Sequence, residues 1–141
     1  MSPNTQRSVS IRRTAAGSYV ATNRRGGELA FGTGGESTDF TPVELLLTAI
    51  AGCTAIDVDT VTARRSEPAS FELSARGDKI RDDDGNRMEN LEVVFRVRFP
   101  DGADGDAARE LLPGMVAKSH DRICTVSRTV ELGTPVRAVV E

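Results

Sequence analysis

The sequence predicts an α+β fold in which antiparallel sheets surround a buried central helix. The expected elements run in the order strands, helix, strands, helix, strands, without the regular strand–helix alternation of a parallel doubly wound sheet. The first expected helix is apolar on nearly every face in its first half, which is typical of a buried helix. With 141 residues the chain has the length of one globular domain, so we expect a single domain over residues 1–141.

Composition excludes several classes of function. Eighteen basic and 21 acidic residues give a net charge of −3, so we expect no nucleic-acid partner. The longest mostly apolar stretch, residues 43–56, is shorter than the roughly 18 to 20 residues that cross a bilayer, and we expect no membrane span. Residues 1–8 contain no apolar segment of the kind found in a secretory signal, so we expect a cytoplasmic protein.

The N-terminal region predicts two or three antiparallel strands. Residues 8–32 alternate short apolar and polar groups, and Ala16-Gly17 and Gly26-Gly27 lie between these groups as turn signals. Residues 32–40 are rich in glycine and small polar residues. They lack the Gly-Lys-Ser/Thr ending of a phosphate-binding loop, so we expect a flexible loop.

A helix start follows that loop. Thr41 can be the N-cap, Pro42 suits the first helical position, and Glu44 can complete a capping box with Thr41. The helical pattern continues to about Arg64, and Pro68 helps to prevent it from going further.

The second half of the chain predicts strands, a helix and closing strands. Residues 71–76 and 91–99 alternate apolar and polar side chains, and residues 81–87 mark a solvated hairpin tip. Residues 107–118 predict a helix that kinks or divides at Pro113-Gly114. One or two closing strands are then expected from a series of apolar residues: Val126, Val130, Leu132, Val136, Val139 and Val140.

The chain has two cysteines, Cys53 and Cys124, and one histidine, His120. Two cysteines are too few for a four-cysteine zinc site, and in a reducing compartment they are either buried inert thiols or a redox pair. His120 could modulate Cys124 or help it bind a metal, or it could be a solvated side chain. The aspartates at 82–84 do not match a calcium-binding loop, and we expect neither metal nor organic cofactor.

Two motifs about seventy residues apart resemble the family of osmotically inducible protein C and the organic hydroperoxide resistance proteins (OsmC/Ohr). The first is the helix start at Thr41 to Leu47, which leads to Ala51-Gly52-Cys53-Thr54. The second is Cys124-Thr125-Val126-Ser127, followed by Gly133-Thr134-Pro135-Val136. The resemblance implies an OsmC-like fold, an intertwined homodimer with the active site at the subunit interface, and a peroxidase that reduces organic hydroperoxides.

The resemblance also implies roles for individual residues. Cys53 would react with the hydroperoxide, Cys124 would form a disulfide with it, and an external dithiol would reduce that disulfide. Burial raises a thiol pKa, so a cation must approach Cys53. In the family an arginine held by a glutamate does this, and Arg24 and Arg25 are the candidates here.

The glutamate position departs from the family pattern. In many of these peroxidases the glutamate directly follows the helix-starting proline, whereas here Val43 does so and the acid is Glu44. Glu44 and Cys53 lie about 13.5 Å apart along one helix, so Glu44 could serve the thiol only from a second subunit; otherwise it is a capping residue. The alternative function is a non-catalytic binding or structural protein of the same fold with inert thiols.

Overall fold

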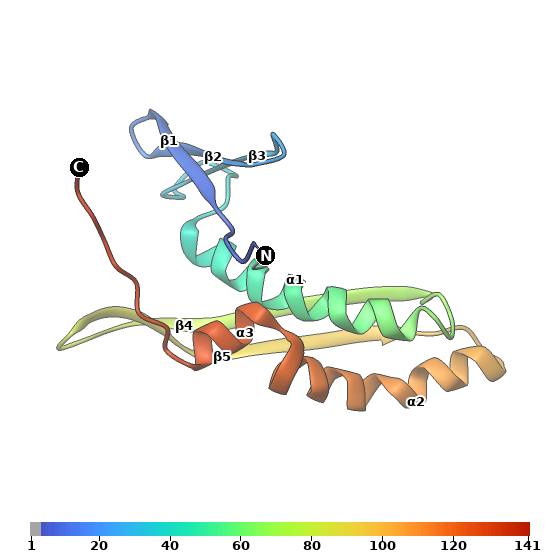
Figure 1. Ribbon diagram of the computed structural model, residues 1–141. Helices are drawn as coiled ribbons and strands as arrows, with labels where there is room; N and C mark the ends of the chain where they lie inside the picture. The colour runs from blue at the N-terminus through green and yellow to red at the C-terminus, as the bar shows by residue number, and fades with distance from the viewer. Residues whose placement is uncertain (1–3) are drawn as a thin grey trace. The chain divides into compact units, whose positions relative to one another are not determined.

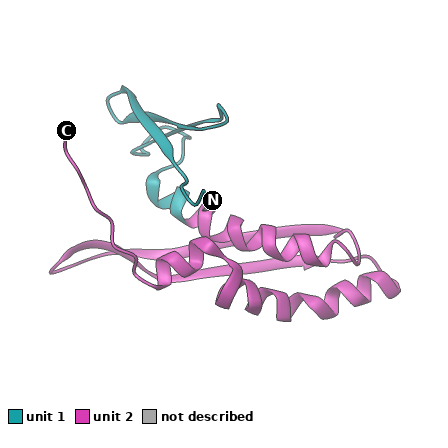
Figure 2. Cartoon of the chain, in the orientation of Figure 1, with its two compact units in different colours: residues 1–46 teal, residues 47–141 magenta. Residues whose placement is uncertain are grey.

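The computed structural model describes residues 4–141, so part of the N-terminal stretch used for the secretory-signal argument lies outside the described residues. The chain divides into two compact units, residues 1–46 and 47–141 (Figure 2). Their strands are antiparallel and their helices are separate from the sheets in sequence, so the predicted α+β class is confirmed. The single domain stays a prediction.

The first unit contains a three-stranded antiparallel sheet. Its strands are β1 (Val9–Ala15), β2 (Ser18–Asn23) and β3 (Glu28–Gly32), in the order β1-β2-β3 (Figure 1). The predicted turns connect them, with Gly17 and Gly26 at positive φ, where glycine is favoured. Tyr19 and Phe31 pair across β2 and β3, and their rings stack with centroids 5.6 Å apart.

Helix α1 (Pro42–Thr62) begins with the predicted capping box. The Thr41 N–H donates to Glu44 Oε1 over 2.9 Å, and the Glu44 N–H donates to Thr41 Oγ1 over 3.3 Å. These bonds satisfy two backbone donors that the first helical turn leaves without partners. The predicted start of the helix is therefore confirmed.

One face of α1 is buried, not the whole circumference. Its buried residues recur every four positions, which places them on one stripe: Ile50, Thr54, Val58 and Thr62. Ile56 is 69% exposed. Helix α1 has 21 residues and a mean hydropathy of 1.5, so by length and composition alone it could cross a membrane. This differs from the prediction that the apolar stretch, taken as residues 43–56, is too short to do so. Core helices pass the same test, and the polar contacts of its buried face favour a core helix.

The second unit contains the longest hairpin of the described chain, β4 (Ser70–Asp82) and β5 (Gly85–Arg98). The predicted strands and solvated tip are confirmed. A bulge between Arg76 and Asp78 interrupts the register, and opposite it Asn90 takes a positive φ of 54°.

Helix α2 (Ala103–Lys118) begins earlier than predicted and does not divide. Asp104 and Asp106 lie in its first turn, where carboxylates interact favourably with the helix dipole. The residues from Ala103 to Asp106, which lie before the predicted helix, are thus its start. Pro113 removes one backbone donor, but the helix continues through it to Lys118.

The predicted closing strands are wrong. After α2 come a π-helical turn, η1 (Ser119–Ile123), and a short helix, α3 (Thr125–Glu131). Val126 and Val130 lie four residues apart, a spacing that fits one face of a helix as well as a strand. Residues 134–141 form neither helix nor strand, and Val136 and Val140 are 95% and 97% exposed.

Candidate functional site

The two cysteines lie together in the second unit. Cys53 is half-buried in the middle of α1, and Cys124 is fully buried between η1 and α3. Both are free thiols, and their sulfurs lie within 4.8 Å of each other. The fold therefore brings together the two residues that the sequence resemblance paired.

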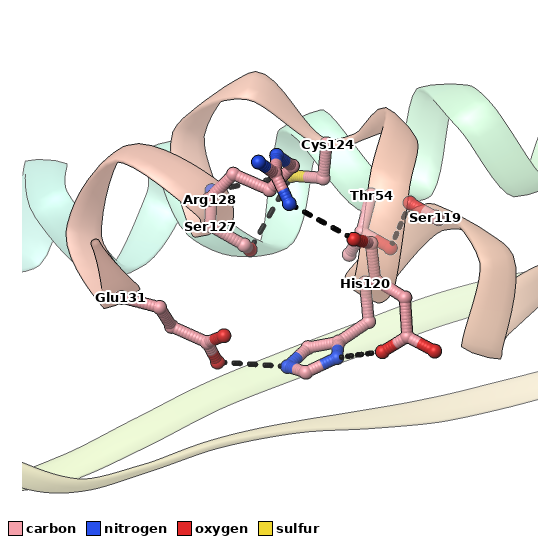
Figure 3. A network of polar contacts seen from close by, with 8 residues as sticks. Thr54, Ser119, His120, Cys124, Ser127, Arg128 and Glu131 are labelled. Atoms are coloured by element: carbon pink, nitrogen blue, oxygen red, sulfur yellow. Dashed lines mark hydrogen bonds and ion pairs between the residues drawn. The ribbon is translucent and has the colours of Figure 1, made fainter.

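Local structure fixes the position of Cys124. The Cys124 N–H donates to the carbonyl of Ser119 over 2.8 Å, which closes the π-helical turn. Cys124 is then the N-cap of α3: its sulfur accepts the N–H of Ser127 at 3.4 Å, and its thiol donates to the Ser127 hydroxyl at 3.3 Å (Figure 3). A thiol held at both its backbone and its sulfur has a defined orientation.

Asp57 is the third member of this site. It lies one helical turn after Cys53 on the same face of α1, and its carboxylate falls within the same 4.8 Å limit as the two sulfurs. Its Oδ2 accepts a 2.8 Å hydrogen bond from Ser119 Oγ. The same hydroxyl lies 2.8 Å from Thr54 Oγ1, and both Ser119 and Thr54 are buried.

The two thiols have opposite electrostatic tendencies. Burial raises the pKa of Cys53, and Cys124 and the Asp57 carboxylate raise it further against a hydrogen bond with the Val126 backbone. Burial also opposes ionisation of Cys124, but hydrogen bonds with Ser127 and Cys53 outweigh it and lower the pKa of Cys124. Within the described chain, none of the groups that shift the pKa of Cys53 is a cation. The cation expected beside Cys53 is therefore not supplied within this site.

Glu44 and the two arginines lie in the first unit. Glu44 is in the capping box, and hydrogen bonds from the backbone and side chain of Thr41 lower its pKa. Arg24 and Arg25 are exposed in the turn between β2 and β3, where Asn23 Oδ1 accepts the N–H of Arg25. Their roles at Cys53 stay predictions.

His120 is held by two carboxylates and not by Cys124. Its Nδ1 lies 2.9 Å from Asp121 Oδ1, and its Nε2 lies 2.8 Å from Glu131 Oε1 (Figure 3). Hydrogen bonds to Asp121 and Glu131 raise the pKa of His120. Both ring nitrogens are therefore engaged, which leaves neither of them for a metal shared with Cys124.

A cavity of about 430 Å³ lies within the second unit, and its lining residues include neighbours of the two cysteines but neither cysteine itself. Thr54 and Ser127, which adjoin the two cysteines in sequence or by hydrogen bond, form part of its wall. Most of the remaining wall is apolar, including Leu47, Ile50, Leu91, Phe95 and Val116. His120, Asp121 and Glu131 add a polar group to it. The cavity can accept an apolar molecule with one polar end.

Sequence reasoning missed Asp57, Ser119 and Ser127. The spacing of Asp57 four residues after Cys53 in a predicted helix was a usable signal, because such residues share a face. Ser119 and Ser127 gave no such signal. The position of Ser119 depends on the π-helical turn, and that of Ser127 depends on α3, which lies where strands were expected.

Comparison with known proteins gives the family. The model of the OsmC-like protein family matches residues 34–139. An uncharacterized protein of Mycobacterium tuberculosis, Rv2923c, is 27% identical over 133 residues, which cover 92% of this chain and 93% of the relative.

Solved structures give the same fold at low sequence identity. An OsmC-like protein from Vibrio cholerae has a TM-score of 0.73 at 14% identity, covering 90% of this chain and 94% of its own. A hypothetical protein from Aquifex aeolicus has a TM-score of 0.71 at 18% identity, with coverages of 94% and 92%. The organic hydroperoxide resistance protein OhrB of Bacillus subtilis has a TM-score of 0.59 at 16% identity, with coverages of 87% and 90%. The predicted family and fold are confirmed: this chain belongs to the OsmC-like protein family.

Proposed function

We propose that this protein is a cysteine-based peroxidase that reduces organic hydroperoxides to alcohols and serves in a stress response in the cytoplasm. The observation that supports this most is the position of Cys53 and Cys124, whose sulfurs lie within 4.8 Å of each other at one site. Family membership supports a redox role, as does the fold shared with a neighbour described as an organic hydroperoxide resistance protein.

The proposed reaction has three steps. The Cys53 thiolate attacks the O–O bond of the hydroperoxide; the O–O bond breaks, the sulfur is oxidised to a sulfenic acid, and the alkoxide takes a proton and leaves as an alcohol. The Cys124 thiol then attacks the sulfenic sulfur, which forms the disulfide and releases water. An external dithiol reduces the disulfide to the two thiols and is itself oxidised to a disulfide.

Exposure favours Cys53 as the first sulfur to react. Cys53 is half-buried, whereas Cys124 has no exposed surface. The raised pKa of Cys53 makes a nearby cation necessary, because the thiolate is the nucleophile. We assign this cation to Arg24 or Arg25 of a second subunit, held by Glu44.

A homodimer follows from this assignment. It agrees with apolar side chains that a single chain leaves in contact with solvent: Ile56 and Leu132 are each 69% exposed, and Val136 is 95% exposed. Sedimentation at micromolar protein should give twice the 15.1 kDa mass of one chain. A mass of one chain would exclude an active site shared between subunits.

The cavity in the second unit supports an organic substrate. Its apolar wall can hold the alkyl part of a hydroperoxide, with the peroxide group at the end formed by Thr54 and Ser127, the neighbours of the two cysteines. Hydrogen peroxide has no such part and gains nothing from this wall. Cumene hydroperoxide should therefore be consumed faster than hydrogen peroxide.

Consumption of cumene hydroperoxide with dithiothreitol as the external dithiol tests the proposal. Ser66→Ala is the control, because the Ser66 hydroxyl donates a hydrogen bond to the carbonyl of the next residue, Glu67. This variant should consume the hydroperoxide at the rate of wild type. Cys53→Ser should be inactive, and Cys124→Ser exposed to the hydroperoxide without dithiothreitol should stop at a sulfenic acid that dimedone traps on Cys53. A sulfenic acid on Cys124 in Cys53→Ser would reverse the two roles.

A binding protein with inert thiols is the second candidate. The observation that favours it is Asp57, whose negative charge raises the pKa of both thiols. Two results together would support this candidate and exclude the peroxidase. Wild type would leave the hydroperoxide unconsumed, and in a separate measurement it would bind an apolar ligand in the cavity.

A further inference from the structure

Three side chains at the cysteine site have the composition and proximity of a metal centre. Cys53, Asp57 and Cys124 each offer one ligand atom, and these atoms lie within 4.8 Å of one another. Thiolates and a carboxylate are ligands that zinc accepts in proteins. We propose that the reduced protein binds one zinc ion between Cys53, Asp57 and Cys124.

The fold presents these ligands from two separate segments. Cys53 and Asp57 are one turn apart on the same face of α1, and Cys124 faces them from the junction of η1 and α3. A helix holds its i and i+4 side chains side by side, so two ligands are placed before any ion binds. The third is fixed by the π-helical hydrogen bond from the Cys124 N–H to the Ser119 carbonyl.

A shell of hydrogen bonds orients the ligands. Ser119 Oγ donates to Asp57 Oδ2 at 2.8 Å, and Thr54 contacts Ser119 at the same distance. Ser119 and Thr54 are 0% and 6% exposed, so the hydrogen bond between them lies inside the protein. The Ser127 N–H donates a hydrogen bond to the Cys124 sulfur and so orients the third ligand. Partners of this kind hold metal ligands in place and affect metal affinity strongly.

The charges of the site also suit a cation. The Asp57 carboxylate repels a thiolate on either cysteine, and two thiolates repel each other. A cation between the three groups reduces this repulsion. A divalent ion offsets two of the three negative charges, and its binding releases the two thiol protons. Three protein ligands leave a fourth zinc position for water, and the half-buried Cys53 and Asp57 leave the ion a route to the site.

Zinc and the disulfide exclude each other because both use the two sulfurs. An organic hydroperoxide that oxidises the zinc-bound pair would take up two protons and give the disulfide, an alcohol, water and free zinc. This consequence depends on the proposed peroxidase function. Zinc binding itself requires only reduced thiols and does not depend on it.

Calorimetric titration of reduced, metal-free protein with zinc chloride, in the absence of any hydroperoxide, tests the site. We expect one zinc per chain with proton release, and a thiolate-to-metal charge-transfer band when cobalt replaces zinc. Cys53→Ser and Cys124→Ser should each lose the charge-transfer intensity of one sulfur and bind zinc at least about tenfold more weakly. Circular dichroism checks that each variant is folded.

Two aspartate variants make the test specific. Asp57→Asn should weaken zinc binding about tenfold or more, whereas Asp59→Asn, on the exposed side of the same helix, should bind like wild type. Ser119→Ala should weaken binding about 10- to 100-fold through the loss of the bond to Asp57. Absence of stoichiometric zinc in reduced wild type, or equal affinity in Asp57→Asn, would overturn the proposal. Neither result bears on peroxidase turnover, which is measured without metal.

Discussion

The hydroxyl of Ser119 donates a 2.8 Å hydrogen bond to the carboxylate of Asp57, which lies 62 residues earlier in the chain. Ser119 is fully buried and also contacts Thr54. This bond joins the π-helical turn to the middle of α1, beside both cysteines. Together with the Thr54–Ser119 contact, it connects the segment carrying Cys124 to the helix carrying Cys53.

Ser119→Ala should therefore lower stability. The substitution removes the partner of the buried Thr54 hydroxyl and one partner of Asp57, and a buried polar group left unsatisfied costs about 1–3 kcal/mol. Urea unfolding should show this loss. Ser74→Ala, at an exposed position of β4, should change the free energy of unfolding by less than about 0.5 kcal/mol. Equal effects of the two variants would contradict the importance of the bond.

Ser127 should control the ionisation of Cys124. Its hydroxyl and N–H lower the pKa of that thiol, so Ser127→Ala should raise the pKa. The measurement is an ultraviolet thiolate titration in a Cys53→Ser background, where Cys124 is the sole thiol. A midpoint that does not move when Ser127 is replaced would contradict this role.

Glu44 has two separable roles. Glutamine can close the same capping box but carries no charge, so Glu44→Gln should melt slightly below wild type and Glu44→Ala should melt lower still. If the carboxylate charge holds the arginine at the thiol, Glu44→Gln should still reduce hydroperoxide turnover. Full turnover in Glu44→Gln would restrict Glu44 to helix capping.

His120 should make stability depend on pH. Its pKa is raised by Asp121 and Glu131, so its contribution is complete below its unfolded pKa of about 6.5 and is lost as the pH rises through the folded pKa. The side chain is 55% exposed, which limits the effect to less than about 1 kcal/mol. The stability difference between wild type and His120→Gln should be larger near about pH 6 than near about pH 9. A difference independent of pH would refute this.

Local signals predicted the parts of the fold that local physics determines. The start of α1 follows from Thr41 and Glu44, because a capping box depends on residues three positions apart. The β4–β5 hairpin follows from strict alternation of apolar and polar residues around a charged tip. Neither prediction required the tertiary structure, and the structure confirms both.

The C-terminal region could not be predicted in this way. Val126 and Val130 suit a strand by propensity, but Cys124 caps a helix there and α2 continues into a π-helical turn. The meeting of Cys53 and Cys124 likewise depends on this packing, and only the family resemblance indicated it. The position of Asp57 beside Cys53 could be predicted from their spacing in a helix. Its hydrogen bond to Ser119 could not, because Ser119 is 62 residues away in the sequence.

Intact-mass measurement of reduced wild type after one equivalent of cumene hydroperoxide tests the central claim most directly. The proposed mechanism predicts the loss of two hydrogens per chain, and peptide mapping should place a disulfide between Cys53 and Cys124. An unchanged mass with both thiols still free to alkylation would contradict the peroxidase.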